Sequence, residues 1–204
     1  MEHGEVGRMI VVRNLSVSYG KKNVIYGFNM DARGVTVLVG PNGVGKSTLL
    51  RAIAGGIKAS GFISIGGKVV LSDNVNLPPE KRDVAYLPQS GGPIPNLTVE
   101  ESLKLAGEPD WEIVEALGIK NLLSLKGREL SGGQRKKVGL AMILSSKKKA
   151  WLLDEPLAGV DHNSRRDISL LIKELSKKKN ATVLWVSHLR EALDVADEVV
   201  ELGR

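Results

Sequence analysis

Hydrophobic and polar residues alternate in the first part of the chain, in the manner of half-buried β-strands. The pattern predicts strands over 9–18 and 24–30 with a turn at 20–23, and a hairpin over 62–71. Between them, residues 35–39 form a short, mostly β-branched run, which is typical of a strand buried on both faces. The N-terminal part is therefore expected to be rich in β-structure.

Helical periodicity begins near the middle of the chain. Residues 88–95 contain three prolines and two glycines, which exclude a helix or a central strand there. Thr98 and Glu101 have the spacing of a capping box, and Asp110 is placed to cap a second helix. Residues 98–126 are therefore expected to form a small helical insert.

Strands and helices alternate on both sides of this insert. The expected strands are 83–87, 150–153, 181–186 and 198–202, and the expected helices are 46–54, 131–144, 162–178 and 189–195. Such alternation predicts an α/β fold with a mainly parallel sheet and helices on both sides. Residues 1–204 are expected to form one domain, with a β-rich N-terminal antiparallel subdomain and core (1–88 and 127–204) and a helical subdomain of about 89–126.

Composition fits a packed domain and excludes several kinds of site. The 204 residues are 42% hydrophobic and 25% charged, and cysteine is absent, which excludes disulfides and thiolate metal sites. No apolar run approaches the roughly 20 residues of a membrane helix, and residues 1–8 lack a secretory signal. A protein that stays inside the cell is expected.

The net charge of +6 does not by itself indicate a nucleic-acid partner. The basic residues form short separate runs at 135–137, 147–149 and 177–179, which are interpreted as solvated faces. Aromatic residues make up only 4% of the chain, which is little for a base-stacking platform. No specific nucleic-acid partner is therefore expected.

A glycine-rich segment lies between a predicted strand and a predicted helix and fits the pattern G-x-x-x-x-G-K-[ST]. Its glycines let backbone N–H groups point at phosphate oxygens, and the helix adds its positive end. Lys46 is expected to reach the β- and γ-phosphates, and Ser47 to ligate Mg²⁺. The expected nucleotide-binding residues are Gly40, Pro41, Asn42, Gly43, Val44, Gly45, Lys46, Ser47 and Thr48.

Two acids follow the apolar strand expected at 150–153. Adjacent acids at the end of a buried strand are costly unless they are paired or bind a metal. Beside a phosphate loop, Asp154 is expected to hold Mg²⁺ through its water shell. Glu155 is expected to act as the general base for the attacking water.

A second anion-binding helix start is predicted at residues 130–134, which read Leu-Ser-Gly-Gly-Gln. Ser131 and Gln134 have capping-box spacing, and Gly132 and Gly133 leave the first N–H groups of the helix bare. The alternative interpretation is simply a well-capped helix.

In their order along nearly the whole chain, these motifs resemble the ATP-binding cassette (ABC) family, specifically the ATPase subunits of ABC transporters. The resemblance implies that Tyr19 stacks on adenine and that Gln89, in the Q-loop, contacts Mg²⁺ and couples to a membrane partner. It implies that His188 is a switch histidine at the γ-phosphate. It also assigns a contact with the other subunit's ATP to Ser131, Gly132, Gly133, Gln134 and the D-loop residue Asp161.

The resemblance further implies a function. ATP and Mg²⁺ would be bound between this chain and a second ABC ATPase subunit, as a homodimer or heterodimer that closes head-to-tail. Lys46, Gln89, Glu155 and His188 would be catalytic, and Ser47, Gln89 and Asp154 would serve the metal. Hydrolysis would energise an integral membrane transporter subunit from the cytoplasmic face of the cell membrane.

Three other classes of protein with a phosphate loop are alternatives to this function. A soluble ABC-type ATPase acting on chromosomes would carry a long coiled coil between the two phosphate motifs, and residues 48–130 show no sustained heptads. A translation-factor type, acting at the ribosome, usually joins two cassettes, whereas this chain has a single one. A nucleoside-monophosphate kinase would share only the phosphate loop, which would leave the signature motif, Glu155 and His188 unexplained. Because the family's extra C-terminal helices do not follow residue 204, the nucleotide-free form is expected to be monomeric.

Overall fold

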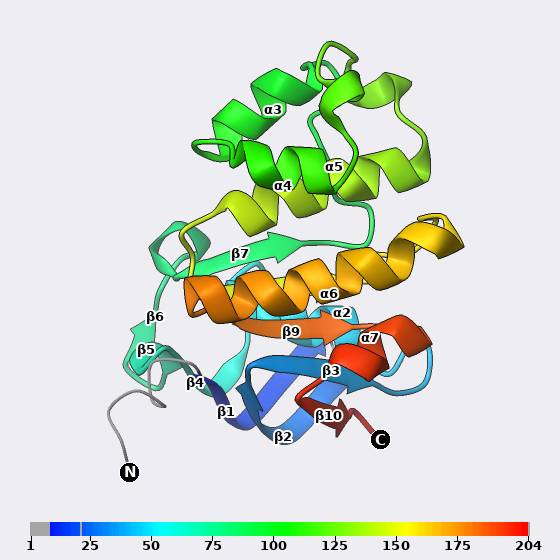
Figure 1. The fold of residues 1–204 in the computed structure, drawn as a ribbon. Helices are drawn as coiled ribbons and strands as arrows, with labels where there is room; N and C mark the ends of the chain where they lie inside the picture. Colours follow the sequence, from blue (N-terminus) through cyan, green and yellow to red (C-terminus); the bar gives the residue numbers. More distant parts are fainter. Residues whose placement is uncertain (1–8, 21, 204) are drawn as a thin grey trace.

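The computed structural model describes residues 9–20 and 22–203. The N-terminal segment 1–8, for which no secretory signal is expected, lies outside the described residues, as do residue 21 of the expected turn and residue 204. Two five-stranded sheets and a set of helices make up the described fold (Figure 1). Two sheets alternating with helices confirm the α/β class.

The first sheet is antiparallel and has the strand order β2-β1-β4-β5-β6. Its strands are β1 (Met9–Tyr19), β2 (Lys22–Arg33), β4 (Ser60–Ile65), β5 (Lys68–Ser72) and β6 (Val75–Asn76). The second sheet is parallel and has the order β10-β3-β9-β8-β7. Its strands are β3 (Val35–Val39), β7 (Val84–Leu87), β8 (Ala150–Asp154), β9 (Thr182–Val186) and β10 (Glu198–Glu201).

The α-helices are α2 (Lys46–Ala54), α3 (Val99–Ala106), α4 (Trp111–Ala116), α5 (Gly132–Ser145), α6 (His162–Lys179) and α7 (Arg190–Val195). Short 3₁₀ turns are η1 (Pro79–Lys81), η2 (Lys120–Leu122) and η3 (Gly127–Glu129). Helices α3 and α4 pack on α5 and form the upper part of the molecule in Figure 1. The expected helical insert and parallel sheet are confirmed, while the division into subdomains at residues 88 and 126 stays a prediction.

The parallel strands are buried on both faces because successive side chains enter two different cores. Trp151, Leu153 and Trp185 lie in the core beneath α5 and α6. Leu152 and Leu184 lie in the core that α2 shares with the antiparallel sheet. Figure 1 shows α6 crossing one face of the parallel sheet with α2 on the opposite face. Both faces are thus covered, so the strands read as continuous hydrophobic runs.

Two helix starts were expected at capping residues of the insert, and one expectation was wrong in detail. The Thr98 hydroxyl accepts a hydrogen bond from the Glu101 N–H at 3.1 Å, and the Glu101 carboxylate accepts one from the Thr98 N–H at 2.7 Å. Asp110 precedes α4, but its side chain makes no capping hydrogen bond. Its carboxylate is engaged by the Lys179 ammonium at 3.4 Å, a partner 69 residues away.

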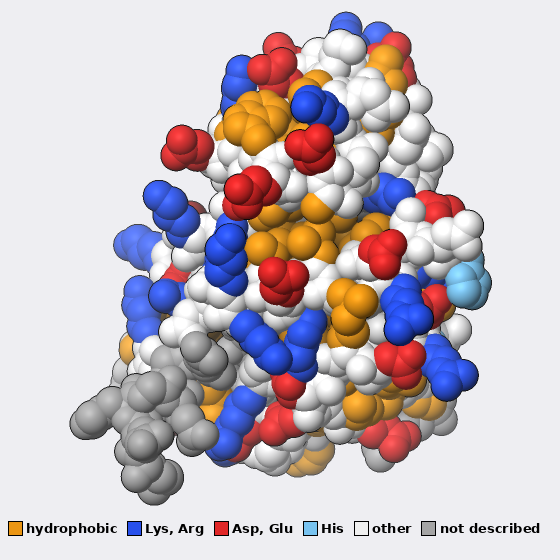
Figure 2. All heavy atoms as spheres, viewed as in Figure 1, with side chains coloured by type: hydrophobic (Ala, Val, Ile, Leu, Met, Phe, Trp, Pro, Cys, Tyr) orange, Lys and Arg blue, Asp and Glu red, His pale blue; other side chains and the backbone are white. Residues whose placement is uncertain are grey.

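Charged side chains of both signs lie on the face of the molecule drawn in Figure 2. On the face drawn in Figure 2, Lys and Arg side chains are interspersed with Asp and Glu. A hollowed band of hydrophobic side chains separates the upper helical part from α6. This face therefore shows no continuous basic stripe of the kind that marks many nucleic-acid-binding surfaces.

Arg82 is a buried cation, only 2% exposed, that joins the end of α2 to the segment leading into β7. Its Nη1 donates to Ala52 O and Ile53 O at 2.8 Å each, and its Nε donates to Leu77 O at 2.8 Å. Its Nη2 donates to Asn76 Oδ1 at 3.1 Å. Ala52 O also accepts the Gly55 N–H at 3.1 Å, and Arg82 adds charged donors to this last turn, so it acts as a C-terminal cap of α2.

We expect Arg82→Met to lower the free energy of unfolding by about 2–4 kcal/mol, because buried carbonyls lose their charged donor. Urea unfolding followed by circular dichroism measures this loss. Arg166→Met is the matched control, since Arg166 is exposed on α6. The control should change stability by less than about 0.5 kcal/mol. Equal effects of the two substitutions would contradict the capping role.

Candidate active site

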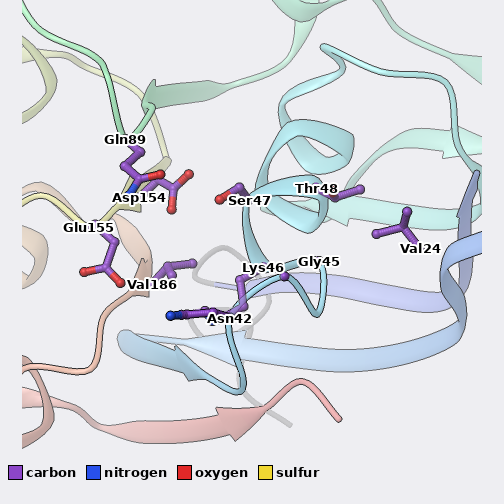
Figure 3. A pocket seen from close by; sticks show the side chains of 11 residues that line it. Val24, Asn42, Gly45, Lys46, Ser47, Thr48, Gln89, Asp154, Glu155 and Val186 are labelled. Atoms are coloured by element: carbon purple, nitrogen blue, oxygen red, sulfur yellow. The ribbon is translucent and has the colours of Figure 1, made fainter. Parts of the chain in front are cut away.

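A cavity of about 500 Å³ lies where β3, β7, β8 and β9 end (Figure 3). We call it the phosphate-loop cavity. It is lined by Val24, Asn42, Gly43, Gly45, Lys46, Ser47, Thr48, Gln89, Asp154, Glu155 and Val186. Parallel strands bring their carboxyl ends to one edge of the sheet, which is where α/β folds bind ligands.

The loop from β3 to α2 takes backbone conformations that favour glycine. Gly40, Gly43 and Gly45 have φ angles of 145°, 76° and 115°. At Gly45 a Cβ would lie 3.0 Å from Val24 Cγ1, so the loop also packs too closely for a side chain there. Gly45 is the N-cap residue of α2, and no side chain caps this helix. The first N–H groups of α2 therefore remain available to an anion.

Lys46 is held within the loop. It is 8% exposed, and its Nζ donates to Gly40 O at 2.7 Å and to Pro41 O at 2.9 Å. The ammonium is thus nearly removed from water and fixed beside the uncapped start of α2. Together they form a positive, donor-rich end of the cavity that fits the phosphates of a nucleotide.

The opposite side of the cavity carries the two acids. Asp154 ends β8 and is 2% exposed. Glu155 has a φ of 50°, an uncommon conformation for a residue other than glycine, and its N–H donates to Val186 O at 3.0 Å. Burial raises the pKa of Glu155, and the Asp154 charge adds to this, whereas His188, Lys46 and Lys136 act against it.

The oxygen ligands present fit Mg²⁺ only if a nucleotide shares in its coordination. Figure 3 shows Ser47 facing Asp154 and Gln89 across the cavity. Over the described residues, no group of three or more His, Asp or Glu side chains could hold a metal ion. Mg²⁺ is usually bound by one or two carboxylates together with substrate phosphates and water, which agrees with this sparse set.

A second cavity of about 280 Å³, here the signature cavity, lies at the start of α5. Its lining includes Ser131, Gly133, Gln134, Lys137, Gly159 and Asp161, and it shares no lining residue with the phosphate-loop cavity. The expected capping box is confirmed, because the Gln134 N–H donates to Ser131 Oγ at 3.2 Å and the Ser131 N–H donates to Gln134 Oε1 at 2.9 Å. A Cβ on Gly133 would collide with the Gly159 carbonyl.

Asp161 has a structural role within its own chain. Its carboxylate accepts a hydrogen bond from the Ser164 N–H at 2.9 Å and caps α6. The Lys137 ammonium lies 3.2 Å from the same carboxylate. These bonds, the one from Ser164 first, lower the pKa of Asp161 to about 2. A contact with another subunit's ATP stays a prediction.

Some expected residues do not line either cavity. Tyr19 ends β1 and is 47% exposed, and His188 is an exposed residue that follows β9. The other expected residues outside the two linings are Gly40, Pro41, Val44 and Gly132. The roles expected for these residues stay predictions.

Three residues in or near the phosphate-loop cavity were not predicted to lie there from the sequence. Val186 ends a recognisable apolar strand, so its position at the sheet edge was readable. Val24 gave no local signal, because it reaches the cavity only through the folding of β2 against the loop at Gly45. Lys136 was interpreted as part of a solvated basic run, and this was wrong: it is 6% exposed.

The comparisons with known proteins bear on the family. The profile of the ABC transporter family matches residues 24–158. The chain belongs to the ABC transporter family. It is 37% identical over 211 residues to the sn-glycerol-3-phosphate import ATP-binding protein of Paracoccus denitrificans, covering 96% of this chain and 58% of that protein.

A second curated relative and a solved structure are also similar to this chain. The chain is 36% identical over 209 residues to the maltose/maltodextrin import ATP-binding protein of Mannheimia succiniciproducens, covering 95% of this chain and 55% of that protein. A solved nucleotide-free ATP-binding cassette from an ABC transporter superposes with a TM-score of 0.80 at 27% identity. That match covers 95% of this chain and 87% of the other. The chain therefore spans less than three fifths of the two curated relatives. None of the described helices is both long and apolar enough to cross a membrane.

We expect Lys46→Ala to weaken ATP binding at least tenfold, because it removes a charged donor worth roughly 1.5–3 kcal/mol. Titration calorimetry with ATP in the absence of hydrolysis measures the affinity. Lys58→Ala is the matched control, since Lys58 is exposed shortly after α2. Unchanged affinity in the Lys46 variant would refute the assignment of the phosphate loop.

Proposed function

We propose that this chain is the ATP-binding and ATP-hydrolysing subunit of an ABC transporter. The observation that carries the proposal is one cavity that joins the uncapped start of α2 and Lys46 to the acid pair Asp154 and Glu155. An anion site beside one buried and one half-buried acid suits a triphosphate with its metal. Family membership and the import ATP-binding relatives support the same function.

The residues that line the cavity, together with Tyr19 and His188 outside its lining, divide the work of hydrolysis. The N–H groups of the loop and the Lys46 ammonium bind the β- and γ-phosphates, and Tyr19 stacks on the adenine. Ser47, Gln89 and, through water, Asp154 would hold Mg²⁺, which would neutralise charge on the phosphates. Glu155 accepts the proton of the attacking water, and its raised pKa suits a general base. His188 contacts the γ-phosphate.

The signature cavity provides the argument for a dimer. In one chain the two cavities share no lining residue, so Ser131 and its neighbours serve no evident purpose toward the nucleotide of their own chain. Closure of two subunits head-to-tail would place Ser131, Gly132, Gly133, Gln134 and Asp161 against the partner's ATP. The second subunit is another copy or a related ABC ATPase.

The transport role requires an integral membrane partner. The two curated relatives are import ATP-binding proteins, which supports import as the direction and a position at the cytoplasmic face of the membrane. The alternative, a soluble ATPase acting on nucleic acid or the ribosome, is not favoured by these relatives.

We expect Glu155→Gln to lower the hydrolysis rate by about 10²–10⁴, because the general base is lost while the phosphate contacts remain. The variant should bind Mg-ATP and accumulate as a dimer. Phosphate release and sedimentation velocity measure the two effects. A variant that stays monomeric at saturating Mg-ATP would argue strongly against a shared nucleotide site.

In the nucleotide-free protein, Glu155→Gln also tests how much the ionised Glu155 carboxylate lowers the free energy of unfolding. Burial raises the folded-state pKa of Glu155, so its ionised form destabilises the fold, and this cost appears as pH rises through that pKa. Glu155→Gln should therefore raise the urea midpoint at pH 8, and the gain should shrink toward pH 4. Glu174→Gln, at an exposed position on α6, is the control and should show no such trend.

A further inference from the structure

Lys136 is a buried cation that the hydrolysis mechanism above does not use. It lies in the second turn of α5 and is 6% exposed. No ion pair among the described residues includes it. A buried charge without a carboxylate partner is costly, so its hydrogen bonds must account for its place.

Those hydrogen bonds go to the segment that follows β7, residues 88–92, here the Q-loop segment. The Lys136 Nζ donates to Pro88 O at 3.3 Å and, through a shorter bond, to Gln89 O. Pro88 O also accepts the Gly91 N–H at 2.8 Å, which closes a turn within the segment. One ammonium therefore holds two consecutive carbonyls, one of them that of Gln89 itself.

Two glycines bring the backbones together on either side of this contact. A Cβ on Gly92 would lie 3.0 Å from Arg135 O. A Cβ on Gly139 would lie 2.7 Å from Leu87 Cδ1 and 3.3 Å from Gly92 Cα. The Q-loop segment thus packs directly on the face of α5 that carries Lys136.

Helix α5 connects the two cavities. Its N-terminus, capped by Ser131, lines the signature cavity, while its second turn reaches the carbonyl of Gln89, whose side chain lines the phosphate-loop cavity. Burial lowers the pKa of Lys136, and the charges of Asp154 and Glu155 act against this. The cation therefore also lies within electrostatic reach of the acid pair.

We propose that Lys136 is a positioning residue that fastens the Q-loop backbone at Gln89 to α5. The bond holds the Gln89 side chain toward the side of the phosphate-loop cavity where Asp154 lies. It also makes the Q-loop and the helix that begins at Ser131 move together. This inference rests on the proposed function for its catalytic meaning, while the contact itself exists in the nucleotide-free chain.

The test replaces Lys136 with Met, an unbranched side chain that is one heavy atom shorter than Lys and has no donors. In the nucleotide-free protein, hydrogen exchange of residues 88–92, including the Gly91 N–H, should become roughly tenfold faster, because charged hydrogen bonds of this strength are lost. Exchange in β8 and α2 should stay unchanged. The Mg²⁺ concentration for half-maximal ATPase should rise several-fold, with ATP affinity measured without Mg²⁺ unaltered.

Two further variants make the result decisive. Lys136→Arg keeps a charged donor and should retain slow exchange and the normal Mg²⁺ requirement. Lys178→Met, at an exposed lysine on α6, should change neither readout. Three outcomes would overturn the proposal. In Lys136→Met, hydrogen exchange of residues 88–92 could stay unchanged, or it could become faster in β8 to the same extent. The third outcome is a Lys136→Arg variant that behaves like Lys136→Met. Failure of the unmodified chain to bind ATP would instead refute the proposed function and leave the exchange result intact.

Discussion

Burial of the parallel sheet on both faces is the constraint on which the active site depends. Residues of β8 and β9 alternate between a core beneath α5 and α6 and a core shared with α2 and the antiparallel sheet. Because neither face is free, ligand chemistry is confined to the edge where the strands end. The phosphate loop, the acid pair and Gln89 meet there although they come from distant parts of the chain.

The site is arranged at a cost to stability. Glu155 combines a left-handed backbone with a raised pKa, and Asp154 beside it is almost fully buried. On the other side, α2 begins without a capping side chain, and Lys46 is held away from water. In the proposed function, a bound triphosphate and its cation would satisfy these groups, and the site would be preorganised for the charge that they bring.

Besides Lys46, two further buried cations donate hydrogen bonds to backbone carbonyls, and neither forms an ion pair with a carboxylate among the described residues. Arg82 binds the carbonyls at the end of α2, and Lys136 binds those at the start of the Q-loop segment. Each fastens an element that bears site residues to a neighbouring element. Arg82 thus fixes the C-terminal end of α2, the helix whose start borders the phosphate-loop cavity, and Lys136 fixes the loop that carries Gln89.

Local features of the chain were readable from the sequence alone. The phosphate loop, the strand 35–39, the helix 46–54 and the capping boxes at Thr98 and Ser131 all depend on residues a few positions apart. Their physics is that of backbone conformation and short-range hydrogen bonds, which neighbouring residues determine.

Tertiary structure decided what depends on distant partners. Asp110 has the sequence of a helix cap, yet its carboxylate is engaged by Lys179 because α6 ends beside it. Lys136 sits in a run of basic residues that indicates a solvated face, and only the packing of residues 88–92 on α5 buries it. The sequence by itself therefore determined these local elements and their capping boxes. The fold determined which charges lose their water, since burial and pairing depend on what lies opposite in space.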